Sequence, residues 1–399
     1  MRTNFIFLAI VLGLLTAIGP FAIDMYLPAL PTIEENLATD TATAQFSLLA
    51  FFIAMALSQV VYGPLADMYG RKGPIYLGLA LYGLGSIGCA LAPSVEWLIA
   101  ARVLQGLGAA SGMVISRAVV RDLHTGPDAA QLMGLLMLVF SVSPILAPLA
   151  GSLILLAGDW RTIFWVMTAA AVAGAVLLAF GLKETRPREI RTEGSLGAAL
   201  KGYRYLMGQP KYLGIVFIGA FAMSSFMVYL ANSSFILIDY YGLNPTLYSL
   251  AFSVNAVGFI GVSQFAGFVG RRVGLRRAMR TAMTANVIIV LALLALTLAG
   301  VGQLEVMIVM LFAGYACLGL VVPSSAVLAL EEYGEIAGMA SALMGTLQFL
   351  TAAVMMGIIG FFFNGTSTPM IAGIAACSII AYGLAVVTVR RREPVPAAE

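Results

Sequence analysis

Apolar stretches of about 20 residues, separated by short polar breaks, follow one another along the whole chain. A helix needs about 20 apolar residues to cross a bilayer, so each stretch predicts one transmembrane helix. The breaks near Gly302 and Gly365 are short enough for a hairpin or a re-entrant segment to remain an alternative there. The expected spans are 5–33, 44–66, 73–92, 96–118, 129–157, 161–182, 212–237, 246–269, 278–300, 304–329, 337–363 and 369–389.

The longest polar stretch lies near the middle of the chain. We therefore expect an N-terminal six-helix bundle over residues 1–182, a cytoplasmic linker over 183–211 and a C-terminal six-helix bundle over 212–399. An all-α membrane protein of twelve transmembrane helices in two pseudo-symmetric bundles is the predicted fold class, an arrangement typical of secondary transporters.

A short segment recurs between the second and third span of each half. The matched positions, 204 residues apart, are Gly63 with Gly267, Gly70 with Gly274, and Lys72 with Arg276. Three matches in ten positions are weak evidence alone, but their equivalent location in both halves supports an internal duplication.

Composition and charge restrict the class further. Of the 399 residues, 61% are hydrophobic and 10% are charged, against roughly 25% charged in soluble domains, which excludes a soluble protein. The net charge of +3 does not suggest a nucleic-acid surface. All but two of the 22 Lys and Arg residues fall on one side if the N-terminus is cytoplasmic, so we expect both termini there, in a bacterial inner membrane.

No segment carries the signature of an enzyme or of an ATP-driven pump. The three cysteines lie far apart inside apolar stretches, so neither a disulfide framework nor a metal site is indicated. A nucleotide-binding loop and a Ser/His/Asp set are also lacking. We expect a protein that is not an enzyme and has no cofactor.

Two ionisable residues lie deep within predicted spans: Asp24 in span 1 and Arg102 in span 4. Placing each of these charged side chains inside the bilayer costs roughly 3 kcal/mol on an insertion scale, so the presence of each needs an explanation. Their similar depth permits an interaction, direct or through water or a neighbour. We interpret Asp24 as a proton-binding carboxylate and Arg102 as its coupling partner; a static buried ion pair is the alternative. Pro20 and Pro28 flank Asp24 and predict a bend around it, although a simple packing kink is equally compatible.

Three further groups are candidates for function. Around the inner end of span 2, Gly63 and Gly70 would allow a close approach and a tight turn, while Asp67 and Arg71 would latch helix ends; membrane anchoring is the alternative for Arg71. In span 5, small residues and prolines, including Pro144, Pro148 and Gly151, would let another helix approach, or serve packing alone. In the back half, Tyr229, Asn232 and Gln348 could line a cavity or form interhelical hydrogen bonds.

These motifs resemble the major facilitator superfamily over essentially the whole chain. Gly63-x-Leu-Ala-Asp67-x-x-Gly70-Arg71-Lys72 is similar to its loop signature, and Arg102-x-x-Gln105-Gly106-x-Gly108 to its span 4 signature for proton coupling. The span 5 segment is similar to the antiporter signature but has Ser143, Ala147 and Ser152 in place of three glycines. Asp24-Met-Tyr-Leu-Pro28, Ser143-Pro-x-Leu-Ala-Pro148 and Asp159-Trp160-Arg161 most resemble the Bcr/CflA drug-resistance group.

The resemblance implies proton-driven drug export by alternating access, with phenicols among the expected substrates. Asp24 would then bind the proton and respond to substrate, Arg102 would couple, and Asp67 and Arg71 would form the inner latch. Aromatic contacts to a drug would come from Tyr26, Phe51, Phe52 and Tyr229. The expected partners are a small-molecule drug, the proton and the lipid bilayer, with the protein as a monomer. Alternatives are a metabolite transporter of the same fold, and a receptor or structural protein, which would leave Asp24 and Arg102 unexplained.

Overall fold

The computed structural model describes residues 2–124, 126–187, 196–333 and 336–389, and this part of the chain is helical without strands. The first half contains α1 (Arg2–Asp24), η1 (Leu27–Ala29), α2 (Leu30–Asn36), α3 (Thr41–Tyr69), α4 (Lys72–Ala90), α5 (Val95–Leu123), α6 (Gly126–Ala157) and α7 (Trp160–Gly181). After them follow α8 (Leu196–Met207), α9 (Pro210–Ser234), the π-helical η3 (Phe235–Tyr240), α10 (Pro245–Ser263), α11 (Ala266–Val273), α12 (Leu275–Leu298), α13 (Leu304–Leu330), α14 (Ala337–Phe361) and α15 (Ser367–Thr388).

The membrane-crossing helices agree with the predicted spans. In the described part of the chain, 11 helical segments are long and apolar enough to cross a bilayer. The 32-residue α6 supplies a twelfth, of which Val142–Ala157 forms an apolar stretch. Separate helices flank the short breaks at Gly302 and Gly365, so the re-entrant alternative is wrong at both places.

Two predicted spans are not continuous helices. Span 1 is interrupted directly after Asp24, where a turn leads into η1 and α2. The predicted span 246–269 is divided by a turn into α10 and α11. Because α11 carries Arg271 and Arg272 in its last turn, it belongs to the polar boundary rather than to the hydrocarbon.

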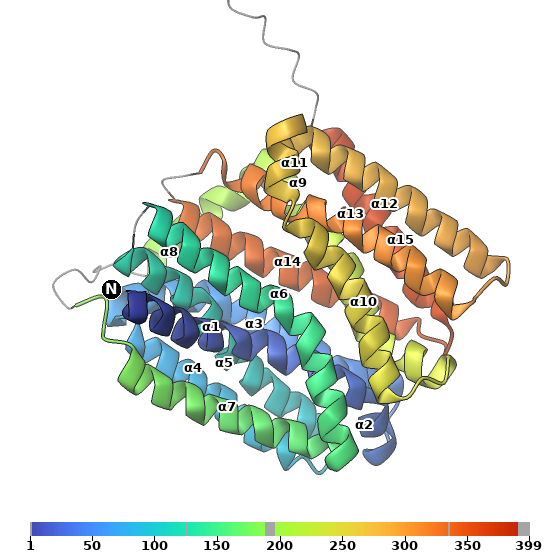
Figure 1. Cartoon of the computed structure of the whole chain (residues 1–399), viewed down its shortest axis with the longest axis horizontal. Coiled ribbons are helices and arrows are strands. Elements are labelled where there is room, and N and C mark those ends of the chain that lie inside the picture. The colour runs from blue at the N-terminus through green and yellow to red at the C-terminus, as the bar shows by residue number, and fades with distance from the viewer. Residues whose placement is uncertain (1, 125, 188–195, 334–335, 390–399) are drawn as a thin grey trace, which may run out of the picture.

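The helices of the first half lie together on one side of the molecule and those of the second half on the other (Figure 1). In the first half α5 packs against α1, α3 and α4, and in the second half α9 packs against α13, α14 and α15. Two pairs of helices, α3 with α14 and α6 with α10, form the main contacts between the halves. The linker prediction falls partly outside the described residues, at 188–195, and the domain boundaries stay a prediction.

One matched pair of glycines in the duplicated segment has a positive φ in both halves. Gly70 has a φ of 88° and Gly274 a φ of 82°. Both angles lie in the left-handed region that glycine adopts without steric cost. The expected tight turn after α3 therefore recurs after α11. The close helix approach expected at Gly63 is wrong for this conformation, because no neighbouring atom lies within 4 Å of the position that a Cβ would take there.

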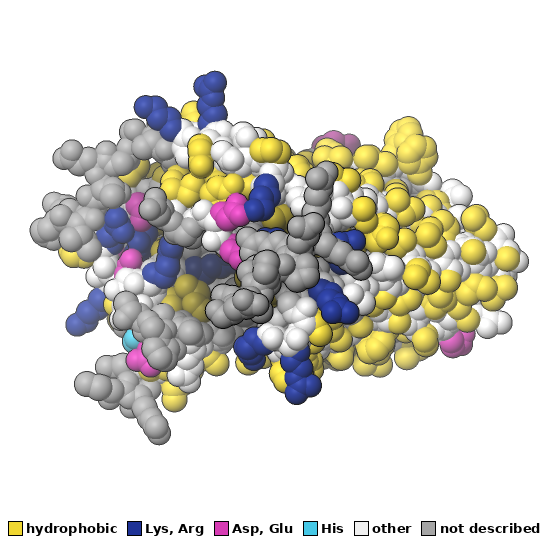
Figure 2. All heavy atoms as spheres, turned by 90° about the horizontal axis from the view of Figure 1, so that it is seen from above, with side chains coloured by type: hydrophobic (Ala, Val, Ile, Leu, Met, Phe, Trp, Pro, Cys, Tyr) yellow, Lys and Arg dark blue, Asp and Glu magenta, His cyan; other side chains and the backbone are white. Residues whose placement is uncertain are grey.

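Hydrophobic and charged side chains separate along the surface. In Figure 2 the Lys and Arg side chains gather over the left-hand part of the visible face, and hydrophobic side chains cover the right-hand part. Large apolar residues such as Phe180 (88% exposed) and Leu156 (71% exposed) lie on the outside of the helices. Such a surface suits contact with lipid acyl chains, as expected for a multi-pass membrane protein.

Candidate transport site

Asp24 is the last residue of α1 and is buried, with 3% of its surface exposed. The helix ends here because Pro28 has no N–H to bond the carbonyl oxygen of Asp24, four residues earlier. The hydroxyl of Ser143, on α6, donates to the carboxylate Oδ2 at 3.3 Å. No described cation lies within ion-pair distance of this carboxylate.

Arg102 is fully buried on α5 but does not pair with Asp24. Its Nη1 donates to the Ala22 carbonyl oxygen at 3.2 Å and to Gln105 Oε1 at 2.6 Å. The guanidinium carbon lies 4.5 Å from the ring centre of Tyr26, within the range of cation–π attraction. Nε and Nη2 have no hydrogen-bond partner. Arg102 therefore contacts the chain on both sides of Asp24, at Ala22 and at Tyr26, but not the Asp24 carboxylate itself.

Two of the predicted aromatic residues belong to this same cluster. The Phe51 ring centre lies 4.3 Å from the Arg102 guanidinium carbon, and the Tyr26 hydroxyl lies 2.7 Å from that of Ser47. Phe52 instead faces the second half, where it stacks on Phe349 with ring centres 5.7 Å apart. Tyr26, Phe51 and Phe52 are all fully buried.

The polar residues predicted in the second half do not join this cluster. Tyr229 stacks on Phe252 with ring centres 5.5 Å apart, and its hydroxyl accepts from Asn255 Nδ2 at 2.9 Å. Asn232 Oδ1 accepts from Gln45 Nε2 of α3 at 3.1 Å and so connects the halves.

Gln348, on α14, is partly buried. Its side-chain nitrogen lies 3.2 Å from the place a Cβ would take at Gly219 of α9. Gln348 therefore packs inside the second half, apart from Asp24 and Arg102.

At the C-terminal ends of α3 and α5, Arg71 is surrounded by carboxylates. Its Nη1 donates to Asp67 at 2.8 Å, and its Nε and Nη2 donate to the two oxygens of Asp122 at 2.7 and 3.1 Å. The backbone N–H of Arg71 donates to Glu184 beyond α7. Burial opposes the charge of Arg71, but its bonds to Asp122 and Asp67 outweigh this effect and raise its pKa. The charged network predicted around Arg71 thus includes Asp122, which no sequence motif indicated.

The span 5 segment lies between α1 and α10. Gly151 is required there, because a Cβ at this position would come 2.2 Å from the carbonyl oxygen of Met25. The carbonyl oxygen of Pro148 accepts from Ser249 Oγ of α10 at 2.9 Å. Pro144, one residue after Ser143, lies within the same segment and is partly buried.

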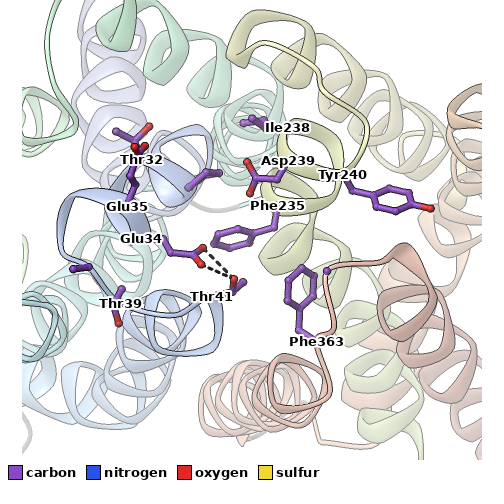
Figure 3. Close-up of a pocket in the computed structure, with 13 residues that line it drawn as sticks. Thr32, Glu34, Glu35, Thr39, Thr41, Phe235, Ile238, Asp239, Tyr240 and Phe363 are labelled. Carbon is purple, nitrogen blue, oxygen red and sulfur yellow. Dashed lines mark hydrogen bonds between the residues drawn. The ribbon is translucent and has the colours of Figure 1, made fainter.

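A pocket of about 840 Å³ lies between the halves, lined by α2 and the start of α3 on one side and by η3 on the other (Figure 3). Glu34 accepts two hydrogen bonds from Thr41, at 2.9 and 3.0 Å, and Asp239 of η3 points toward it from the other half. Phe235 and Phe363 form part of the wall. Among the described residues no group of three or more His, Cys, Asp or Glu side chains is arranged to hold a metal ion.

A family model described as Major Facilitator Superfamily matches residues 12–356. The chain belongs to this superfamily. It is 35% identical to the protein named Uncharacterized MFS-type transporter YdgK of Bacillus subtilis (strain 168), over 91% of this chain and 90% of that protein. It is 30% identical to the Bicyclomycin resistance protein homolog of Haemophilus influenzae, over 95% of each chain. A third relative, Multidrug resistance protein MdtL of Klebsiella pneumoniae (strain 342), is 28% identical over 94% and 93% of the two chains.

Solved structures of major facilitator transporters have the same fold. A D-xylose-proton symporter superposes with a TM-score of 0.72 at 16% identity, covering 97% of this chain and 96% of the other. The human organic anion transporter MFSD10 superposes with a TM-score of 0.68 at 19% identity, covering 96% and 98%. Together, the family and fold confirm the predicted two-bundle transporter fold and a transport function rather than an enzymatic one.

Proposed function

We propose that this protein is a proton-driven drug efflux antiporter that exports small amphipathic compounds such as phenicols. The names of two relatives, a bicyclomycin resistance protein homolog and a multidrug resistance protein, support a drug as the substrate. Transport would proceed by alternating access, with the bundles predicted over 1–182 and 212–399 moving against each other around a central site.

The environment of Asp24 carries the proposal. A carboxylate in the membrane is expensive to bury, and a structural carboxylate would normally be paired with a cation. Asp24 has one serine hydroxyl as its hydrogen-bond partner and lies where the helix is interrupted. A group in this setting can accept and release a proton with a small change in its surroundings, so that a proton and a drug can compete for the same state.

The other predicted residues receive complementary roles. Arg102 would sense the charge of Asp24 through the α1 segment that it holds, and Tyr26, Phe51 and Phe52 would offer aromatic surface to a drug. Tyr229, Asn232 and Gln348 would contribute from the second half as the bundles move. Gly63, Asp67, Gly70 and Arg71 would form the inner latch, and Pro144, Pro148 and Gly151 a bendable contact with the second half.

The clustering of Lys and Arg toward one end supports an orientation with both termini in the cytoplasm (Figure 2). Residues 390–399, with the last three arginines, lie outside the described residues. We propose a monomer in a bacterial inner membrane, an environment that supplies the proton gradient for export.

The test measures drug-induced proton release from inverted membrane vesicles acidified by respiration, with a pH-sensitive dye. Addition of chloramphenicol or florfenicol should cause dequenching with the wild-type protein and none with Asp24→Asn at equal expression. Asp159→Asn, at the exposed N-cap of α7, is the matched control and should respond as wild type. An unaltered response in Asp24→Asn would refute the role of Asp24. Silence toward phenicols and a broad drug panel would favour proton-coupled transport of an endogenous metabolite.

A further inference from the structure

One short segment of α6 touches both the proposed proton site and the second half. Ser143 donates to Asp24, and nine residues later Ser152 reaches α10. At the helical rise this is a distance of about 13 Å along one helix. Gly151 lies directly against the carbonyl of Met25, the residue after Asp24, so this segment of α6 is in close contact with the chain where α1 ends.

Hydroxyl groups on α6 and α10 connect the two halves near the start of α10. The Ser152 and Ser249 hydroxyl oxygens are 2.6 Å apart. Ser152 is also 2.8 Å from the Pro245 carbonyl oxygen of α10, and Ser249 is 2.9 Å from the Pro148 carbonyl oxygen of α6. One turn further in, Ser253 donates to the Ile145 carbonyl oxygen at 3.1 Å. We call this set of contacts the serine gate.

The serine gate depends on residues that distinguish this chain from the antiporter signature. Ser143 and Ser152 occupy two positions where the signature has glycine, and glycine has no hydroxyl to donate. Pro144 and Pro148 each remove one backbone hydrogen bond, so the segment between the two serines can bend once its contacts to α10 are lost.

We propose that Ser143 is a positioning residue that links the protonation of Asp24 to the serine gate. The inference rests on the proposed function of Asp24 as the proton carrier. A charged carboxylate makes the stronger hydrogen bond, so the deprotonated, empty carrier holds α6 in place with the outer side closed. A proton on Asp24 weakens this bond, releases α6 from α10 and lets the outer side open. The empty protein then cannot open outward without a proton, which limits uncoupled movement.

Few other ionisable groups lie near this link. Arg102 of α5 contacts Ala22 of α1 and Tyr26 in the turn after it, and Tyr248 is the ionisable residue of α10. The stretch of α6 from 133 to 157 and that of α7 from 162 to 181 contain no ionisable side chain. Glu34 of α2 and Asp239 of η3 also titrate, and they face each other across the pocket between the halves. The part of a pH response that belongs to Asp24 is therefore the part that Ser143→Ala removes.

The test measures the distance between spin labels on the outer ends of α6 and α10, without any drug. Labels at Leu156→Cys and Leu247→Cys use exposed positions, 71% and 48% exposed. Cys317, which is partly buried, is replaced by Ala, while Cys89 and Cys377 are buried. In the otherwise wild-type protein, a change from mildly alkaline to mildly acidic pH should raise the open-to-closed ratio by about fivefold, the size expected when a charge-assisted hydrogen bond becomes neutral.

Variants distinguish the hydrogen bond between Ser143 and Asp24 from the contacts of the serine gate. Ser143→Ala should abolish most of the pH response, whereas Ser143→Thr, which keeps the hydroxyl, should retain it. The double variant Ser152→Ala and Ser249→Ala should raise the open population at both pH values and still respond to pH. Ser116→Ala on α5, whose hydroxyl bonds Leu12 within the first half, is the matched control and should behave as wild type.

Two outcomes would overturn the proposal: a wild-type protein without any pH response, or a full response in Ser143→Ala. Neither depends on drug transport. A pH response of the gate without phenicol-linked proton release would refute the proposed function and leave the role of Ser143 intact. Phenicol-linked proton release without a pH response of the gate would refute the role of Ser143 alone.

Discussion

The two carboxylates that bind Arg71 should differ strongly in what they contribute to stability. Asp67 lies in the loop signature, but its side chain is 46% exposed and makes one bond to Arg71. Asp122 lies outside the signature; its side chain is 17% exposed and makes two bonds. The Arg71 side chain is 4% exposed, so the loss of its main partner leaves a buried charge with only the more exposed Asp67 to pair with it.

These exposures set the expected magnitudes. An exposed ion pair contributes at most about 1 kcal/mol, which limits the cost of Asp67→Asn. Breaking a buried pair costs about 3 to 5 kcal/mol, and some access of water to Asp122 places Asp122→Asn near the lower value of about 3 kcal/mol. The difference of about 2 kcal/mol corresponds to a roughly thirtyfold ratio in the unfolding equilibrium constant.

Reversible unfolding in mixed detergent micelles, followed by circular dichroism, measures both variants against wild type. Asp128→Asn, exposed at the start of α6, removes a carboxylate from the same side of the molecule and serves as the control for net charge. Added salt should reduce the effect of Asp67→Asn more than that of Asp122→Asn, because exposed charges are screened more. The reasoning is wrong if Asp67→Asn destabilises the protein as much as Asp122→Asn.

Two further predictions concern helix ends and helix crossings. Hydrogen bonds from the Thr43 hydroxyl and backbone N–H hold the pKa of Asp40, the N-cap of α3, below its ordinary value. Asp40→Ala should therefore cost up to about 1 kcal/mol at neutral pH. The stability gap between wild type and this variant should close as the pH falls below about 4 through the lowered pKa, and a pH-independent gap would contradict the assignment. A Cβ at Gly112 would lie 2.1 Å from the Leu15 carbonyl oxygen, so Gly112→Ala should lower stability by about 1 to 3 kcal/mol. The control Gly63→Ala, inside α3 and in open space, should instead raise stability by about 0.5 to 1 kcal/mol. Equal effects of the two substitutions would show that the crossing of α5 and α1 is not tight.

Much of the fold could be predicted because the bilayer imposes a simple rule on the sequence. Each helix must present enough apolar length to cross the hydrocarbon, so the spans and their number follow from local composition. The break after Asp24 could also be anticipated, since Pro28 acts on the backbone only four residues away. The turns at Gly70 and Gly274 were signalled by the repeat and share the same positive φ.

Contacts between distant helices were the part that sequence reasoning missed. Asp122 lies at the end of α5 in no recognised motif, and only the packing of α3 against α5 brings it to Arg71. Ser249 is one small polar residue among many in the spans, and its role depends on the crossing of α6 and α10. Burial and charge alone could not indicate that Arg102 bonds to the backbone beside Asp24 instead of to its carboxylate.

The sequence by itself determined the class of this protein, its spans and the two charges that demand an explanation, because insertion into lipid depends on the composition of each segment. Only the tertiary structure decided which groups those charges meet. A hydrogen bond requires atoms to lie within about 3 Å of each other, and the rotation and crossing of whole helices set that distance. Asp24 meets Ser143 and Arg102 meets Ala22 for this reason.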